Sequence, residues 1–217
     1  MTLSIKDPGS AITHFIGMML AILAAIPLLV LASMHNGGSE VAAFAIFACS
    51  MILLYGASAT YHTLNISEKV NRILRKIDHM MIFILIAGSY TPICLLPLRD
   101  SIGIPLLILV WGAAAIGILV KAFWITCPKW FSSLLYISMG WLCVLAMVPL
   151  VRALPAVSFF WLLTGGIIYT AGGIIYALKL PLFNSRHQFW GSHEIFHLFV
   201  MGGSLCHFIV MFQIACM

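Results

Sequence analysis

The chain has 217 residues, of which 63% are hydrophobic and 8% are charged, and its formal net charge is +5 at pH 7. A soluble domain carries roughly a quarter charged residues, so this composition excludes an ordinary water-soluble protein. The positive charge does not indicate nucleic-acid binding, because no stripe of lysines interleaved with aromatic residues is present. Six cysteines are scattered without a C-x-x-C pair, which favours small core residues over a disulfide framework or a zinc knuckle.

Seven segments are long and apolar enough to cross a bilayer as helices, which takes about 20 residues each. In chain order they cover approximately residues 14–34, 40–62, 77–98, 102–123, 131–151, 157–178 and 194–216. Turn-rich breaks such as HNGGS, PLRDS and KLPLFNSRHQFWGS separate them. The sequence therefore predicts an all-α fold, a seven-transmembrane-helix bundle that forms a single domain over residues 1–217. Pro149 predicts a bend in the fifth span, and the glycine pairs 165–166 and 172–173 predict a smooth face on the sixth.

The basic residues predict how the bundle is oriented. Nine of the 11 Lys and Arg residues fall on the side of the membrane that holds the amino terminus, and four of them lie in the segment KVNRILRK before the third span. The opposite side receives only Arg99 and Arg152. Short loops rich in Lys and Arg stay in the cytoplasm. We therefore expect the amino terminus inside, the carboxyl terminus outside, and a multi-pass protein of the plasma membrane.

With this topology, several polar residues from distant parts of the chain share one depth near the cytoplasmic face. His62 ends the second span, Asp78 begins the third, and His193 and His197 begin the seventh. Residues four apart lie on one helix face, so His193 and His197 project together, as do Ser58 and His62. Three neutral imidazoles with an oxygen donor or water form a ligand set that suits zinc. The sequence therefore predicts a metal site formed by these histidines with Asp78 beside them.

Taken one at a time, these residues also have ordinary structural explanations. A carboxylate in a first turn can simply cap its helix, and a serine in a span can serve helix packing. For the remaining histidines we predict structural roles of this ordinary kind. His14, His35 and His187 are predicted to anchor the chain at the membrane interface. His207 is predicted to be a buried, hydrogen-bonded core residue, and His79 is expected to point away from the carboxylate that precedes it.

The segment from His193 to His197 also reads H-E-x-x-H, the pattern of a zinc-protease helix. Such a protease needs a third protein ligand, and no Asp or Glu follows Glu194 in the chain. The third ligand must then come from upstream, where His62 is the candidate. This argument disfavours the protease interpretation.

The motifs SATYH, KIDHMMIFILIAGSYTP and HEIFHLFVMGGSLCHF, with THFIG before the first span, resemble the bacterial hemolysin III branch of the progestin and adipoQ receptor superfamily. The resemblance implies seven helices with a cytoplasmic amino terminus and a zinc ion near the inner face. The zinc histidines of that superfamily fall on His62, His193 and His197. Its aspartate, which engages the metal through water, falls on Asp78, and its nearby serine falls on Ser58.

The superfamily is similar to alkaline ceramidases, which implies a zinc-dependent hydrolase of lipid amides or esters with Asp78 and Ser58 as catalytic residues and a membrane lipid as substrate. Animal receptors of the superfamily tend to carry an amide where this chain has Glu194, so no role for Glu194 follows from the resemblance. Two alternatives stay open. One is a receptor-like protein or membrane-homeostasis sensor with structural zinc and no enzymatic activity, and the other, with less physical support, is cytolytic activity in a bacterial inner membrane protein.

Overall fold

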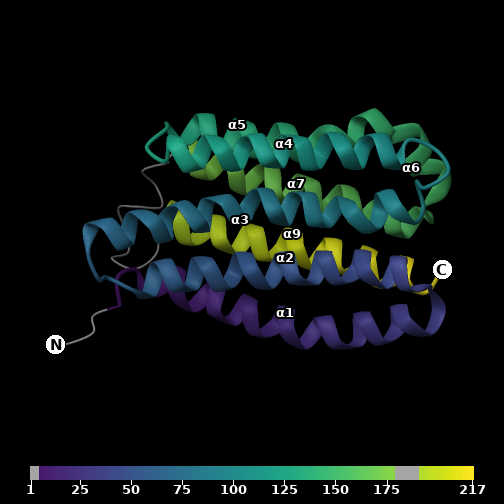
Figure 1. The fold of residues 1–217 in the computed structure, drawn as a ribbon, viewed down its shortest axis with the longest axis horizontal. Coiled ribbons are helices and arrows are strands. Elements are labelled where there is room, and N and C mark those ends of the chain that lie inside the picture. Colours follow the sequence, from purple (N-terminus) through teal and green to yellow (C-terminus); the bar gives the residue numbers. More distant parts are fainter. Residues whose placement is uncertain (1–4, 179–190) are drawn as a thin grey trace.

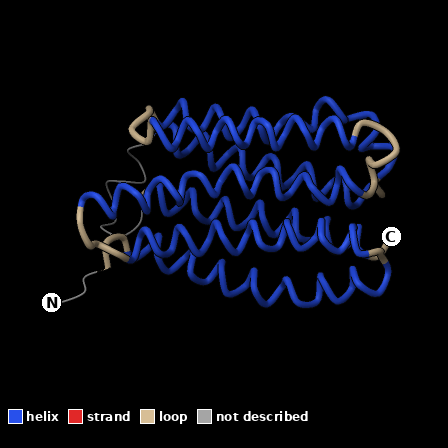
Figure 2. The backbone as a smooth tube through the Cα atoms, viewed as in Figure 1, coloured by secondary structure: helices blue, strands red, loops and turns tan. Residues whose placement is uncertain are grey.

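The computed structural model describes residues 5–178 and 191–217. Over these residues the chain is helical, without a strand, as Figures 1 and 2 show. The helices are α1 (Pro8–His35), α2 (Gly38–Thr63), α3 (Glu68–Leu95), α4 (Gly103–Phe123), α5 (Lys129–Gly140), the 3₁₀ helix η1 (Trp141–Ala146), α6 (Met147–Ala153), α7 (Ala156–Leu178) and α9 (Ser192–Ala215). Seven helical segments in this part of the chain are long and apolar enough to cross a membrane, with residues 129–153 forming one of them. The predicted fold class is confirmed.

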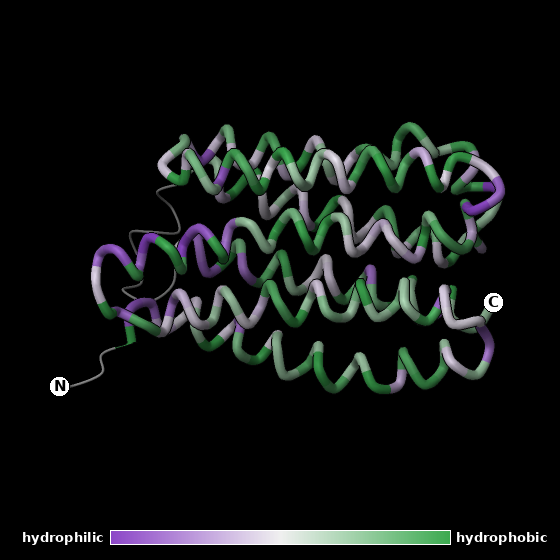
Figure 3. The backbone as a smooth tube through the Cα atoms, in the orientation of Figure 1, coloured by the Kyte–Doolittle hydropathy of each residue, from purple (hydrophilic) through white to green (hydrophobic). Residues whose placement is uncertain are grey.

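The helices pack side by side as an elongated bundle. Helix α1 contacts α2 and α9, α3 contacts α2 and α4, and α7 contacts α5 and α9. Large apolar side chains such as Leu23, Ile26 and Ile108 stay exposed on the outside, as expected where lipid replaces water. Figure 3 shows the hydrophilic residues gathered at the two ends of the bundle, with the larger share where α3 begins. The basic segment before the predicted third span lies within α3, which already begins at Glu68. This segment is therefore part of the same end of the bundle.

The fifth span is a broken helix. An α-helix ends at Gly140, a 3₁₀ helix runs from Trp141 to Ala146, and a short α-helix follows. Pro149 has no N–H for the carbonyl one turn before it, and its ring crowds that turn, so the backbone changes its winding upstream of the proline. The hydroxyl of Tyr90 stabilises the break, because it donates to the carbonyl of Gly140 and accepts from the N–H of Cys143 at 2.8 Å. The predicted bend is thus a six-residue change of helix type.

Two glycines of α7 allow α9 to approach closely. A Cβ atom added at Gly165 would lie 2.4 Å from the ring of His207, and one at Gly172 would lie 2.6 Å from Phe199. Both distances are shorter than real Cβ contacts allow, so only glycine fits. The predicted smooth face of the sixth span therefore packs against α9 through these two positions, whereas Gly166 has nothing within 4 Å of such an atom in the described chain.

Candidate metal centre

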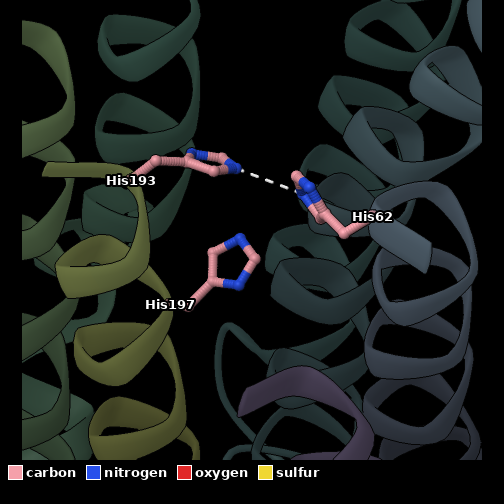
Figure 4. A group of neighbouring side chains, drawn as sticks. All are labelled: His62, His193 and His197. Atoms are coloured by element: carbon pink, nitrogen blue, oxygen red, sulfur yellow. Dashed lines mark hydrogen bonds between the residues drawn. The ribbon is translucent and has the colours of Figure 1, made fainter. Parts of the chain in front are cut away.

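Three histidines from two helices meet inside one end of the bundle. His62 lies in the last turn of α2, and His193 and His197 lie four residues apart at the start of α9. One ring nitrogen from each lies within 4.8 Å of the others. The Nε2 atoms of His62 and His193 are 3.1 Å apart, and Figure 4 shows the three rings facing a common point. The predicted convergence of these histidines is therefore present.

The arrangement fits a divalent metal ion. Two nitrogens on a tetrahedral zinc lie roughly 3.3 Å apart, because Zn–N bonds are about 2.0–2.1 Å long. The 3.1 Å between the His62 and His193 nitrogens is close to this value. His62 and His197 are only 2% exposed, and the buried Nδ1 of His193 has no hydrogen-bond partner among the described residues. Buried polar atoms are rarely left unpaired, so a cluster of imidazoles with one hydrogen bond inside it is the kind of group that a cation completes.

Asp78 and Ser58 border this cluster without belonging to it. Asp78 is 6% exposed and lies on α3, and its oxygens are not part of the group whose ligand atoms lie within 4.8 Å of one another. Ser58 lies one turn before His62 on α2, and its buried Oγ has no hydrogen-bond partner in the part of the chain that the structure describes. Both residues line the same cavity as His193 and His197.

A mainly apolar cavity of about 140 Å³ extends from the histidines into the bundle. Its wall is formed by residues of α1, α2, α3, α7 and α9 together with the broken fifth span, which contributes Gly140, Trp141 and Leu150. His207 lines it as well, with its ring edge-on against Tyr169, but neither ring nitrogen has a hydrogen-bond partner among the described residues, so the hydrogen bond predicted for it is absent there. His207 follows His197 by ten residues, so it lies roughly 15 Å further along α9. The cavity thus joins a polar end to a long apolar interior.

Comparison with known proteins gives the family. The model of the family described as "Haemolysin-III related" matches residues 4–208. The chain belongs to the haemolysin-III related family. It is 39% identical to the Hemolysin-3 homolog of Bacillus subtilis (strain 168), over 94% of this chain and 91% of that protein. It is 41% identical to Hemolysin-3 of Bacillus cereus, over 99% and 94% of the two chains. A more distant relative is the Adiponectin receptor protein of Drosophila melanogaster, 23% identical over 93% of this chain and 49% of the receptor.

In this haemolysin-III related chain, His14 is buried beside the three-histidine cluster. It is 3% exposed, and its ring lies parallel to that of His197, with centroids 3.6 Å apart. The interfacial role predicted for His14 is therefore wrong, because α1 begins at Pro8 and its first turns lie inside the bundle against α9. Of the other two histidines given that role, His35 is exposed at the end of α1, and His187 lies outside the described residues.

The position of His79 also differs from its prediction. Its Nδ1 lies 2.9 Å from the carbonyl oxygen of Arg75 and 3.3 Å from Oδ2 of Asp78. The ring turns back along α3 toward the carbonyl one turn earlier, and this rotation brings Nδ1 to the carboxylate of the preceding residue. Rotation about the helix axis alone does not fix where a flexible side chain ends. His79 therefore lies beside the Asp78 carboxylate, while its hydrogen bond goes to the Arg75 carbonyl.

Glu194 has a local structural role. The N–H of Gly191 donates to Oε2 at 2.8 Å, which caps the start of α9, and the hydroxyl of Ser10 donates to Oε1 at 2.7 Å. One carboxylate oxygen thus binds the start of α9, and the other binds α1. In the H-E-x-x-H pattern of this family member the glutamate fastens α9 to α1, which agrees with the rejection of the protease interpretation.

Proposed function

We propose that this haemolysin-III related protein binds zinc through His62, His193 and His197 and hydrolyses an acyl amide or ester of a membrane lipid. The observation that carries the proposal is the three-histidine cluster at the mouth of an apolar cavity inside a membrane-spanning bundle. Such a cavity suits hydrocarbon, and a zinc ion held by the cluster would supply hydrolytic chemistry at one end of it.

Zinc, when bound, would lower the pKa of its water toward 7 and polarise the substrate carbonyl. The residues of the chain have separate tasks. Asp78, whose Oδ2 lies 3.3 Å from Nδ1 of His79, would accept a proton from the attacking water. The Ser58 hydroxyl, which has no other partner among the described residues, would donate to the oxygen that gains negative charge. The apolar wall of the cavity would hold the acyl chain and exclude bulk water.

The test uses purified protein in lipid nanodiscs with labelled lipid amides and esters. Wild type is expected to release fatty acid, and Asp78→Asn and Ser58→Ala are expected to lose about 100-fold or more in rate while they keep the metal. A matched control is Ser133→Ala, since Ser133 also lines the cavity with a buried hydroxyl that has no partner in the described chain. Zero turnover by zinc-loaded wild type, or full activity of Asp78→Asn, would overturn the hydrolase.

A second candidate is a receptor-like protein or membrane-homeostasis sensor in which the metal is structural. It is favoured by the placement of the three histidines, which would tie α2 to α9, and by the similarity to the Drosophila receptor. In that case chelation would lower thermal stability, and no lipid product would appear. Cytolytic activity is a lesser candidate that rests on the names of the two Bacillus relatives. Lysis of cells by externally added protein would support it. We further propose the bacterial inner membrane as the location.

A further inference from the structure

The segment before α1 reaches the end of α2 and contacts His62 twice. The backbone N–H of Asp7 donates to the carbonyl oxygen of His62 at 2.9 Å. The carboxylate Oδ2 of Asp7 lies 2.9 Å from Nδ1 of the same histidine. The main-chain bond fixes where Asp7 stands, and the side chain then meets the ring nitrogen that faces away from the other histidines. Asp7 and His62 are thus joined by one main-chain hydrogen bond and one side-chain contact.

Helix capping does not explain this carboxylate. Asp7 occupies the position before the first turn of α1, where an aspartate normally accepts from a backbone N–H of that turn. Within the described chain its side chain makes no such capping bond. Lys6 lies 3.9 Å from the same oxygen, too far for a close hydrogen bond, and its ammonium stacks over the ring of Tyr61. The close partner of the carboxylate is therefore the imidazole.

The contact decides which nitrogen of His62 carries the proton. An ionised carboxylate only accepts hydrogen bonds, so Nδ1 of His62 must be the N–H donor. The lone pair of the neutral ring is then on Nε2, the atom that lies 3.1 Å from Nε2 of His193. A metal ligand needs that arrangement, with the coordinating nitrogen bare and the other nitrogen held by an acceptor.

The first turns of α1 also contact the Nδ1 atom of His197, through Thr13. The single hydrogen of the Thr13 hydroxyl is directed at the carbonyls of Gly9 and Ser10, whose oxygens lie 2.9 and 3.0 Å away. Its oxygen is therefore left as an acceptor, and Nδ1 of His197 lies 3.4 Å from it. This bond is longer and uncharged, so it orients the ring less firmly than the carboxylate orients His62. Two of the three histidines thus have their Nδ1 atom in contact with residues 7–13.

We propose that Asp7 is a positioning residue of the metal centre, which fixes the orientation and the Nδ1–H tautomer of His62 and thereby strengthens metal binding. The inference rests on the zinc site proposed above. Carboxylates that hold a ligating histidine in this way typically change metal affinity by about 10- to 100-fold when they are removed. The same factor is expected for Asp7→Ala, and a smaller one for Asp7→Asn, whose amide oxygen still accepts from Nδ1–H but carries no charge.

The experiment measures the zinc dissociation constant of purified, metal-stripped protein by competition with a chromogenic chelator. Lys6→Ala is the matched control, since it changes the neighbouring residue of the same segment, and it should stay within about twofold of wild type. Asp7→Ala is expected to bind zinc about 10- to 100-fold more weakly. The melting temperature of the stripped protein should stay near that of wild type, because the backbone bond to His62 remains. The Asn variant keeps the test valid if the Ala variant fails to fold.

The outcomes separate the two proposals. Wild type that binds zinc, together with Asp7→Ala that binds it as tightly as Lys6→Ala does, overturns the role of Asp7 and leaves the metal centre standing. Wild type that binds no zinc overturns both. A loss of affinity in Asp7→Ala that follows a matching loss of stability in the stripped protein assigns Asp7 to folding alone and likewise overturns the inference.

Discussion

The rings of His14 and His197 are stacked, with centroids 3.6 Å apart and planes inclined by 8°. The other side of His14 meets the ring of Tyr55 edge-on at 5.1 Å. His14 therefore fills the space between α1, α2 and α9 just beneath the three-histidine cluster, and it supports His197 from one face of its ring.

Shortening His14 should loosen this packing. His14→Ala is expected to lower the free energy of unfolding by about 2 kcal/mol or more, because a buried ring is lost and its neighbours relax only in part. His14→Phe keeps the ring, and neither nitrogen of His14 has a hydrogen-bond partner in the described chain, so it should cost about 1 kcal/mol or less. Denaturant unfolding in detergent checks both variants. Equal losses in the two would contradict the packing role.

Removal of the metal should destabilise the bundle. A ligand that binds only the folded state adds about 2.7 kcal/mol at a concentration 100 times its dissociation constant. Zinc at that level is therefore expected to raise the melting temperature of stripped wild type and to leave His193→Ala unchanged. His35→Ala serves as the control, because His35 is exposed at the opposite end of α1. A zinc response that persists in His193→Ala would place the ion elsewhere.

The contact between α7 and α9 can be tested with two adjacent glycines. Gly165→Ala should destabilise the protein by about 1–3 kcal/mol, since the new Cβ would lie 2.4 Å from the ring of His207. Gly166→Ala meets nothing within 4 Å among the described residues and should be neutral or slightly stabilising, because alanine favours helix. The melting temperatures of the two variants, compared with that of wild type, test this expectation. The packing argument fails if they behave alike.

The predicted orientation is open to a direct measurement with alkaline phosphatase, which is active only outside the cytoplasm. Fusions after Asp100 and after Met217 should be active, and a fusion after Thr126 should be inactive. The reason is the excess of Lys and Arg on the side that holds the amino terminus. The reverse pattern of phosphatase activity would contradict the predicted orientation and place the amino terminus outside.

The fold and the convergence of the three histidines were predictable from the sequence because both depend on local patterns. Length and hydropathy define the spans, and the direction of each successive span brings His62 to the depth of His193 and His197. Spacing by four residues then aligns the last two on one face of α9.

The remaining parts of the centre depend on contacts between distant segments, which no local pattern encodes. Asp7 and His14 were missed because the predicted first span began at residue 14, whereas α1 begins at Pro8 and its first turns reach α2 and α9. THFIG was the available signal for His14, and it served only to support the resemblance. The 3₁₀ segment 141–146 was likewise invisible, because its geometry depends on the Tyr90 hydroxyl of another helix.

The bonds Ser10–Glu194 and Thr13–His197 each join residues 184 positions apart. During translation α1 leaves the ribosome long before α9 does, so Ser10 and Thr13 meet Glu194 and His197 only when the last helix arrives. A nascent chain that stops before α9 lacks two of the three histidines. An ion that needs all three histidines, as proposed above, would therefore be bound only after the last helix is in place.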